Sequence, residues 1–186
     1  MRTIFALCIA LGAIISWAAS DPTVAVTGGQ IHSVSLSKGG AVFKGIPFAA
    51  PPVGDLRWRE PQPVKPWPGV RDTTKSGPIC AQKPTFIAPN AAEVSSEDCL
   101  YLNVWIADWP STSRKAVMVW IPGGGNFAGG GTDAVFDGES LARHGVVLVT
   151  INYRLGPFGS IRILRLHVSH RTEHQAIRAF RIKSPR

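Results

Sequence analysis

Two apolar runs separated by a glycine-rich loop constrain the fold of this chain more than any other feature. The runs are Ala116–Ile121 and Val146–Asn152. In both, apolar side chains occupy odd- and even-numbered positions, so both faces of a strand would be apolar. This pattern is expected for strands that are covered on both faces. Between the runs lie the loop Gly123–Gly131 and a short helical segment, Ser140–His144. A strand, a glycine loop, a helix and a second strand predict an α/β fold with a mostly parallel central sheet.

Shorter β-like segments come before this unit. Val24–Thr27 and Ile31–Ser35 flank two glycines and predict a hairpin. Ala41–Ile46 and Leu100–Ile106 predict two further strands, the second of them buried. The stretch 47–68 contains too many prolines for a helix or a central strand, so we expect it to wrap over the surface and bury its apolar side chains there.

The first twenty residues have the composition of a secretory signal. Arg2 supplies a positive charge, Thr3–Trp17 is mostly apolar, and Ala18–Ser20 places small residues before a cleavage site at Asp21. We therefore expect a secreted or periplasmic protein. After residue 20 no apolar run approaches the length of a membrane span, so we expect none in the mature chain.

Removal of the signal would leave two cysteines, Cys80 and Cys99, in an oxidising compartment. A disulfide closing this loop would stabilise the fold by about 2–4 kcal/mol, mainly by restricting the unfolded chain. Two free thiols are the alternative, which an oxidising destination disfavours.

The positive charge of the chain is concentrated at its C-terminal end. The 186 residues have a formal net charge of +8, of which residues 160–186 carry +6 and residues 21–159 only +1. A basic balance can indicate nucleic-acid or anionic-membrane binding, but here it belongs to the tail, so we expect no nucleic-acid partner. The tail histidines His167, His170 and His174 lack supporting ligands at a suitable spacing, so we expect no metal site.

Three consecutive glycines, Gly123–Gly125, directly follow the first apolar run. Glycines at the carboxyl end of a strand let the backbone approach a ligand with its N–H groups directed at an anion. The two common phosphate-binding patterns, G-x-x-x-x-G-K-[ST] and G-x-G-x-x-G leading into a helix, are absent. An oxyanion hole for acyl transfer needs backbone donors about 3 Å from the developing charge, which such a loop can supply. Taken alone, the motif is also compatible with a flexible turn.

Several blocks within residues 22–159 indicate a family. The two most specific are Ser96–Val104, with the sequence SEDCLYLNV, and Asn152–Gly159, with NYRLGPFG. The other matching segments are Phe43–Ala49, Pro51–Gly54, Leu56–Trp58 and the glycine loop. These blocks resemble the type-B carboxylesterase/cholinesterase family of α/β-hydrolases. The resemblance implies an α/β-hydrolase fold of which this chain holds the N-terminal portion, and hydrolysis of small carboxylic esters through an acyl-serine intermediate without a cofactor.

The resemblance also implies roles for individual residues. The matching positions are Gly124 and Gly125 as donors of the oxyanion hole, Cys80 and Cys99 as the first disulfide, and Arg57 and Glu97 as a buried ion pair. Where the family usually has His or Tyr before the glycines and Phe after them, this chain has Pro122 and Asn126, and Pro122 removes a donor and fixes φ.

Arg154 is expected to lack its partner. In the family this arginine pairs with an Asp a little further along the chain, whereas no Asp follows Asp137 in this sequence. A buried, unpaired arginine is costly, and we also expect the sheet to end with an uncovered apolar edge.

The catalytic residues of the family are missing from the 186 residues. No G-x-S-x-G motif for a nucleophilic serine occurs. Gly138–Ala142 is a near match that lacks the closing glycine, so Ser140 is predicted to cap a short helix. We therefore expect no catalytic serine, acid or histidine, and an inactive chain. The alternative is a non-catalytic binding protein of the cholinesterase-like adhesion type, which would need a complete sheet.

Residues 160–186 form a basic tail outside the family pattern, and all 19 glycines precede it. When Glu173 onward is back-translated with chosen synonymous codons and read two bases later, it gives ASGNSGISDQIAA. This matches the family segment S-G-N-x-G-x-x-D-Q, including the Asp that Arg154 lacks. We hypothesise a frameshift near Gly159–Ser160, from mutation or sequencing error.

Overall fold

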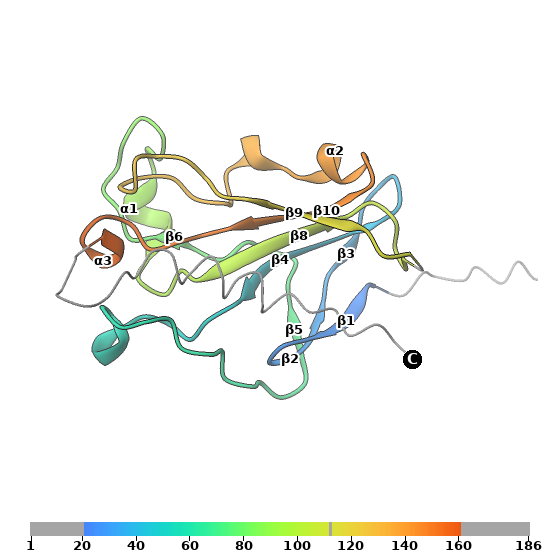
Figure 1. Cartoon of the computed structure of the whole chain (residues 1–186), viewed down its shortest axis with the longest axis horizontal. Helices are drawn as coiled ribbons and strands as arrows, with labels where there is room; N and C mark the ends of the chain where they lie inside the picture. The colour runs from blue at the N-terminus through green and yellow to red at the C-terminus, as the bar shows by residue number, and fades with distance from the viewer. Residues whose placement is uncertain (1–20, 112, 161–186) are drawn as a thin grey trace, which may run out of the picture.

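The structure is a computed structural model that describes residues 21–111 and 113–160 (Figure 1). The expected signal segment, 1–20, and residues 161–186 of the tail, with their three histidines, lie outside the described residues. Within the described part, three sheets of five, three and two strands form the framework, and the helices are short.

The central sheet has five strands in the order β3–β4–β8–β10–β9. These strands are β3 (Val34–Ser35), β4 (Ala41–Pro47), β8 (Tyr101–Ile106), β10 (Val146–Ile151) and β9 (Ala116–Trp120). β9 and β10 pair in parallel, as their connection through the glycine loop and a helix predicts, and the other three neighbouring pairs are antiparallel. This part of the sheet therefore departs from the mostly parallel arrangement that we expected. Connections such as 36–40 and 107–115 simply reverse the chain, whereas parallel strands need a crossover.

The two faces of the central sheet are covered differently. On one face lies α2 (Glu139–Ala142), where Ala142 packs with Val42, Trp105 and Leu148 (Figure 1). The opposite face carries the larger hydrophobic cluster. Its central members are Ile31, Phe43, Leu102, Val104, Val149 and Ile151. Because β8 and β10 contribute buried side chains to both faces, they form the centre of the core.

The second sheet contains the predicted hairpin. β1 (Thr23–Val26) and β2 (Gly29–His32) pair antiparallel, and β5 (Val70–Asp72) pairs with β2 in parallel. The segment predicted as one strand from residue 31 to residue 35 is divided between two sheets at Ser33. The buried hydroxyl of Ser33 lies within hydrogen-bond distance of the carbonyls of Val42 and Thr73, so its one proton is shared between them at the point where the chain leaves one sheet and enters the other.

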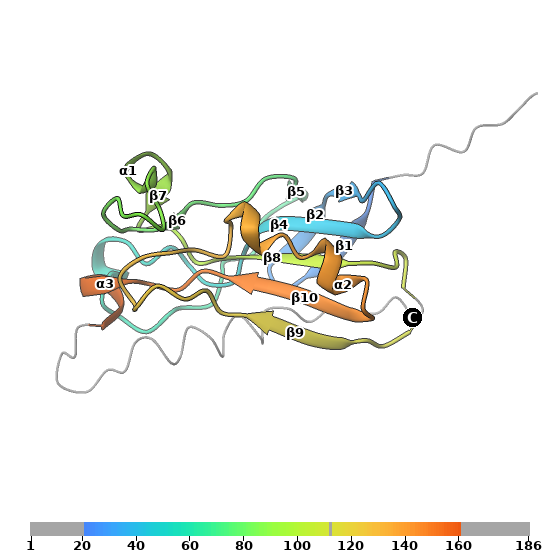
Figure 2. The same cartoon turned by 90° about the horizontal axis from the view of Figure 1, so that it is seen from above.

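β9 is the strand at one edge of the central sheet (Figure 2). We predicted that it would be buried on both faces, and this was wrong. Val117, Met118 and Trp120 are 55%, 44% and 41% exposed, because α2 lies over β8 and β10 rather than over β9; Phe136 contacts the Trp120 ring but leaves it partly exposed. The apolar sequence of β9 therefore forms an exposed edge in the described part of the chain.

The first residues of α2 also differ from the prediction. Ser140 is inside the helix, and the N-cap is Gly138. A side chain at Gly138 would meet Leu148 at 2.5 Å and Trp105 at 2.7 Å, so the close approach to the sheet requires glycine at this position. The Asp137 carboxylate accepts the Glu139 N–H at 3.0 Å, so it binds a free amide of the first turn.

In the Pro-rich stretch 47–68 only Pro47, the last residue of β4, belongs to a strand; the rest contains none, as predicted, and only the 3₁₀ turn Gly54–Leu56. Trp67 lies against the glycine turn of the hairpin, where its indole N–H donates to the Gln30 carbonyl at 2.9 Å. Trp58, by contrast, is 44% exposed rather than buried.

The remaining elements are short. They are β6 (Ile79–Cys80), α1 (Ala91–Val94), β7 (Ser95–Ser96), the 3₁₀ turn Ala134–Phe136 and α3 (Gly156–Ser160). Among the described residues, no helix has the length and apolar character needed to cross a membrane.

Candidate functional site

The glycine loop begins where β9 ends, and residue 152 follows the end of β10. Because β9 and β10 are parallel, both carboxyl ends lie at the same edge of the sheet. This is the edge at which α/β sheets usually bind ligands. Ser140 on α2 immediately precedes the amino end of β10, so it lies toward the opposite end of the sheet from the loop.

Residues 129–131 of the loop are fixed by buried polar side chains. The Gly131 N–H donates to Asn152 Oδ1 at 2.8 Å, and the Gly131 carbonyl accepts from Thr150 Oγ1 at 2.7 Å and Asn103 Nδ2 at 3.1 Å. Asn103, Thr150 and Asn152 are each at most 3% exposed. Asn103 Oδ1 also accepts the Gly45 N–H at 2.9 Å, which links this network to β4. Buried polar groups that are satisfied in this way give a single well-defined arrangement.

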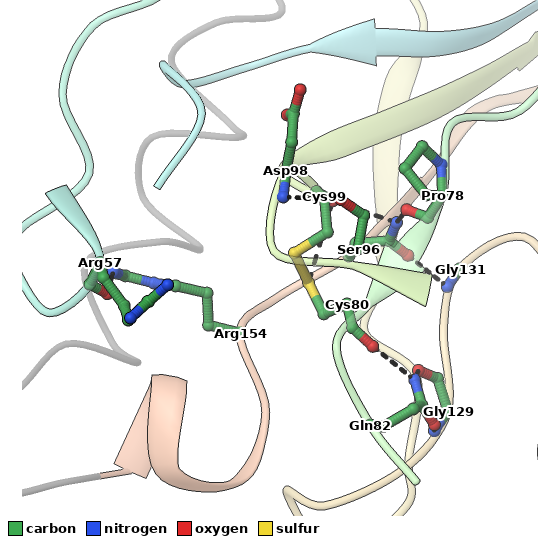
Figure 3. Close-up of a disulfide and its surroundings, with 11 residues drawn as sticks. Arg57, Pro78, Cys80, Gln82, Ser96, Asp98, Cys99, Gly129, Gly131 and Arg154 are labelled. Carbon is green, nitrogen blue, oxygen red and sulfur yellow. Dashed lines mark hydrogen bonds between the residues drawn. A yellow bond between two sulfur atoms is a disulfide. The ribbon is translucent and has the colours of Figure 1, made fainter. Parts of the chain in front are cut away.

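The same network extends to a disulfide between Cys80 and Cys99 (Figure 3). Asn152 Nδ2 donates to the Cys99 carbonyl at 3.2 Å and to the Pro78 carbonyl at 2.9 Å. The Gln82 amide accepts the Gly129 N–H at 2.8 Å and donates to the carbonyls of Gly129 and Cys80, both at 2.9 Å. The disulfide and residues 129–131 are therefore joined into one rigid unit.

Residues 124–126 of the loop are shaped by backbone conformation. Gly124, Gly125 and Asn126 have φ values of +130°, +63° and +62°, which favour glycine and, among other residues, asparagine. A side chain on Gly124 would come within 1.8 Å of the Ala128 carbonyl oxygen, so only glycine fits there. Asn126 stands where the resemblance predicts an aromatic residue. Its backbone is left-handed, a conformation that asparagine adopts more readily than an aromatic residue, and this accounts for asparagine at the position.

Two contacts attach this half of the loop to the chain after β10. The Tyr153 hydroxyl donates to the Pro122 carbonyl at 2.8 Å, and the Gly156 N–H donates to the Asn126 carbonyl at 2.7 Å. Within the loop, the Gly124 carbonyl accepts from the N–H groups of Phe127 and Ala128, both at 3.2 Å.

The N–H groups of Gly124 and Gly125 have no hydrogen-bond acceptor among the residues that the structure describes. Gly125 is exposed and Gly124 is half-buried. Two successive amide dipoles are therefore available to an anion at the carboxyl end of β9.

Arg57 and Glu97 form a bidentate ion pair. Arg57 Nε lies 2.5 Å from Glu97 Oε2, and Arg57 Nη2 lies 2.8 Å from Oε1. The two side chains are 38% and 25% exposed, so the pair is half-buried rather than buried as expected. The Glu97 hydrogen bond raises the pKa of the Arg57 guanidinium. This pair joins the Pro-rich stretch to the segment before β8.

Arg154 is buried, with 4% of its surface exposed. Its Nη1 donates to the carbonyls of Arg57 and Arg59, each at 3.0 Å, whereas Nε and Nη2 have no partner among the described residues (Figure 3). Burial lowers the pKa of this guanidinium. Among the described residues, Arg154 therefore lacks partners at Nε and Nη2, as expected for an unpaired arginine, but not at Nη1.

No G-x-S-x-G motif occurs in the described residues, and in this part of the chain no three His, Cys, Asp or Glu side chains gather as metal ligands. The buried polar network was not predicted. Its signal was present in the sequence, because Asn103 lies within an apolar strand and must find hydrogen-bond partners there.

Comparison with known proteins places this arrangement in a family. The model of the carboxylesterase family matches residues 20–168. The chain belongs to the carboxylesterase family. The resemblance to type-B carboxylesterases that the sequence blocks indicated is therefore confirmed. The match begins one residue before the expected cleavage site and continues nine residues beyond Gly159.

Curated relatives are esterases of bacteria and animals. Fumonisin B1 esterase of Sphingopyxis macrogoltabida is 48% identical over 117 residues, covering 63% of this chain and 22% of that protein. Para-nitrobenzyl esterase of Bacillus subtilis is 46% identical over 124 residues, covering 65% of this chain and 25% of that protein. Carboxylesterase 1D of Rattus norvegicus is 42% identical over 168 residues, covering 80% and 29%. The chain thus spans about a quarter of the length of these relatives.

Solved structures agree with this assignment. A PNB esterase superposes with a TM-score of 0.75 at 36% identity, and a thermophilic PNB esterase with a TM-score of 0.77 at 35% identity. Each match covers 86% of this chain and 34% of the solved one. The expected α/β-hydrolase fold is therefore confirmed, and the chain forms a portion of it.

Proposed function

We propose that residues 22–159 form the oxyanion-binding portion of a secreted serine ester hydrolase. The observation that carries this proposal is the pair of N–H groups on Gly124 and Gly125, which have no acceptor among the described residues and lie at the carboxyl end of β9. The esterase names of the relatives support a carboxylic ester of a small molecule as the substrate.

The chemistry follows from the position of the two donors. When a serine attacks an ester, the carbonyl oxygen acquires negative charge in the tetrahedral intermediate. Donors that already point at this oxygen stabilise the charge without reorganising, and each is worth roughly 3 kcal/mol of transition-state stabilisation. Gly124 and Gly125 would supply these donors. Pro122 has no N–H and therefore cannot be a donor itself.

The nucleophile would have to come from outside these residues. Because no G-x-S-x-G motif occurs in the 186 residues, we propose that this chain alone does not hydrolyse esters. The purified chain should leave a nitrophenyl ester intact and should not react with a serine-directed phosphonate. Hydrolysis that the phosphonate blocks would contradict this part of the proposal.

A chimera tests the oxyanion role directly. Residues 22–159 would replace the matching segment of Bacillus subtilis para-nitrobenzyl esterase, and the chimera should hydrolyse a para-nitrobenzyl ester. Gly124→Ala keeps the N–H but must displace it, because the added side chain would lie 1.8 Å from the Ala128 carbonyl oxygen; we expect kcat to fall by up to about 10²–10³, the range for loss of one correctly placed oxyanion donor. Gly123→Ala is the matched control, because a side chain there meets no atom within 4 Å. Equal kcat values for the two variants would refute the assignment of the donors.

The limits of the functional segment are also part of the proposal. We propose that residues 1–20 are removed on export, so the N-terminus of the exported protein should be Asp21 by mass spectrometry. Residues 160–186 are proposed to be read out of frame. The nucleotide sequence decides this, because any codons that do not encode the shifted S-G-N-x-G-x-x-D-Q segment would exclude the frameshift.

A further inference from the structure

Gln82 holds both polar groups of the Gly129 backbone (Figure 3). Its Oε1 accepts the Gly129 N–H at 2.8 Å, and its Nε2 donates to the Gly129 carbonyl at 2.9 Å. Nε2 also donates to the carbonyl of Cys80 at 2.9 Å, so both hydrogens of the amide are used. Because Cys80 is itself bound in the disulfide, Gly129 is attached through Gln82 to a fixed part of the fold.

Gly129 in turn packs against the carbonyl of Gly123. A side chain at Gly129 would come within 2.6 Å of the Gly123 carbonyl oxygen, so the two backbones are in direct contact. This carbonyl belongs to the same peptide group as the Gly124 N–H. The group is planar and trans, so its C=O and N–H point in opposite directions. The contact with Gly129 therefore limits the directions in which the Gly124 N–H can point.

The next peptide group, which carries the Gly125 N–H, is held from the same side. The Gly124 carbonyl accepts the N–H groups of Phe127 and Ala128, both at 3.2 Å. The carbonyls of both donor peptide groups thus contact one short segment, residues 127–129. Both N–H groups point away from this segment, because each is opposite to its carbonyl.

The other attachments of the loop act outside these two peptide groups. The hydrogen bonds from Tyr153 and Gly156 hold peptide groups that come before and after the pair. The buried side chains around Gly131 act two residues beyond Gly129. Gln82 binds the segment that lies behind the donors.

We propose that Gln82 is a positioning residue for the oxyanion donors, an inference that rests on the proposed function. By holding Gly129, Gln82 keeps residues 127–129 behind the peptide groups of Gly124 and Gly125, and so keeps both N–H groups in a fixed direction. Donors that are already oriented stabilise the developing charge without reorganising. Gln82 therefore acts on the rate of the chemical step and does not itself contact the ester.

The first test measures order in the whole 186-residue chain and needs no activity. Gln82→Met keeps the length of the side chain and loses all three hydrogen bonds. The ¹⁵N order parameters of the Gly124 and Gly125 N–H groups should be about 0.85 in the wild type and below about 0.6 in this variant. Gln62→Met is the matched control. The exposed Gln62 amide donates to the carbonyl of Glu60, so this variant should keep the wild-type order parameters.

Gln82→Glu gives a reversible version of the same test. At pH 7 its carboxylate still accepts the Gly129 N–H but cannot donate to the carbonyls of Gly129 and Cys80, so both order parameters should fall. The two carbonyl oxygens should also raise the pKa of this carboxyl above the ordinary value of about 4.3. At pH 4 the protonated carboxyl can donate again, so the order parameters should recover, whereas Gln82→Met should show no recovery.

The second test measures the rate in the chimera with Bacillus subtilis para-nitrobenzyl esterase. Gln82→Met should lower kcat for a para-nitrobenzyl ester by about 10-fold to 10²-fold, because the donors are misplaced rather than removed. KM should change by less than about twofold, since the donors act on the transition state more than on the bound ester. Gln62→Met should leave both constants unchanged.

The outcomes separate this proposal from the proposed function. Order parameters that are unchanged in Gln82→Met, or already below about 0.6 in the wild type, overturn the positioning role. An unchanged kcat overturns it if Gly124→Ala lowers kcat in the same chimera. If Gly124→Ala also leaves kcat unchanged, the oxyanion role fails, and a loss of order in Gln82→Met still supports positioning of the loop by Gln82. If Gln82→Met does not fold, the recovery of Gln82→Glu at pH 4 decides: its absence overturns the proposal.

Discussion

The two halves of the glycine loop differ in what fixes them. Residues 129–131 are bound by the side chains of Gln82, Asn103, Thr150 and Asn152, all of which belong to other segments of the fold. Residues 124–126 are shaped by positive φ values, and the N–H groups of Gly124 and Gly125 have no acceptor in the described part of the chain. Side chains of other segments hold the first half, whereas the second half takes its shape from backbone conformation and is attached to the chain after β10 through the Tyr153 and Gly156 hydrogen bonds.

This difference shows how a loop can leave donors free without losing its shape. A free backbone N–H in a mobile loop would have no defined direction. Here the polar network and the disulfide fix one end of the loop, and β9 fixes the other. Because Gly125 is exposed and Gly124 half-buried, their N–H groups can bind water until a ligand arrives, while the fixed ends of the loop keep the direction of these groups defined.

The largest expected effect comes from breaking the network at Asn152. Asn152→Leu would remove the side-chain hydrogen bonds of the Gly131 N–H and the Pro78 carbonyl, and one of the two hydrogen bonds to the Cys99 carbonyl, which keeps the Tyr101 N–H at 2.8 Å. Since each such group costs about 1–3 kcal/mol, we expect the free energy of unfolding to fall by about 4 kcal/mol. Urea unfolding of the purified chain measures this. A loss below 1 kcal/mol would mean that the network contributes little to this half of the loop.

The same comparison explains what could be predicted from the sequence. Local patterns identified the hairpin, the strands β4, β8 and β10, and the parallel pair around the glycine loop. They also indicated the three glycines Gly123–Gly125 after a strand as a loop that could supply oxyanion donors, whereas the individual positions Gly124 and Gly125 came from the resemblance to the family. The resemblance to the family supplied the Arg57–Glu97 pair and the unpaired Arg154, whereas the two cysteines that remain after the signal already predicted a disulfide.

Features that depend on distant segments were predicted poorly. β9 has the composition of a central strand, but its exposure depends on which segments lie beside it. Ser140 has a good capping side chain, yet the close approach of Gly138 to Trp105 and Leu148 determines where α2 begins. The network around Gly131 joins positions up to 74 residues apart, at Asn152 and Pro78, a separation that no local pattern reports.

The disulfide is expected to give the next largest effect. It closes a loop with a sequence separation of 19 residues and adjoins the network through the carbonyls of both cysteines. Replacing Cys80 and Cys99 together by alanine should lower the free energy of unfolding by about 3 kcal/mol, mainly through the entropy of the unfolded chain. Treatment with a reductant should destabilise the wild type and leave the double variant unchanged. An effect of the reductant on the double variant would show that it acts elsewhere.

Two glycine substitutions test the half that is shaped by conformation. Gly124→Ala places a side chain at φ +130° and 1.8 Å from the Ala128 carbonyl oxygen, so we expect a loss of about 2 kcal/mol. Gly123→Ala meets open space, so its effect on the free energy of unfolding should stay within about 0.5 kcal/mol. Thermal unfolding of both variants gives the comparison. Similar losses for both would mean that backbone conformation does not distinguish these positions.

The smallest effect is a pH dependence at Tyr101, which adjoins the half fixed by the network. Its carbonyl accepts the Asn152 N–H at 3.0 Å, and burial, with a further contribution from Asp98, raises the pKa of its hydroxyl to about 12. The folded state therefore binds this proton more tightly than the unfolded state, whose pKa is about 10. The resulting stability is complete below pH 10 and is lost as the pH rises toward 12. Since the side chain is only half-buried, solvent screening should keep the loss below about 1 kcal/mol.

Urea unfolding at pH 9 and pH 11 measures this loss. The free energy of unfolding should decrease more for the wild type than for Tyr101→Phe, which cannot ionise at this position. Equal decreases would show that this tyrosine has the same pKa in both states and does not link pH to the stability of the network.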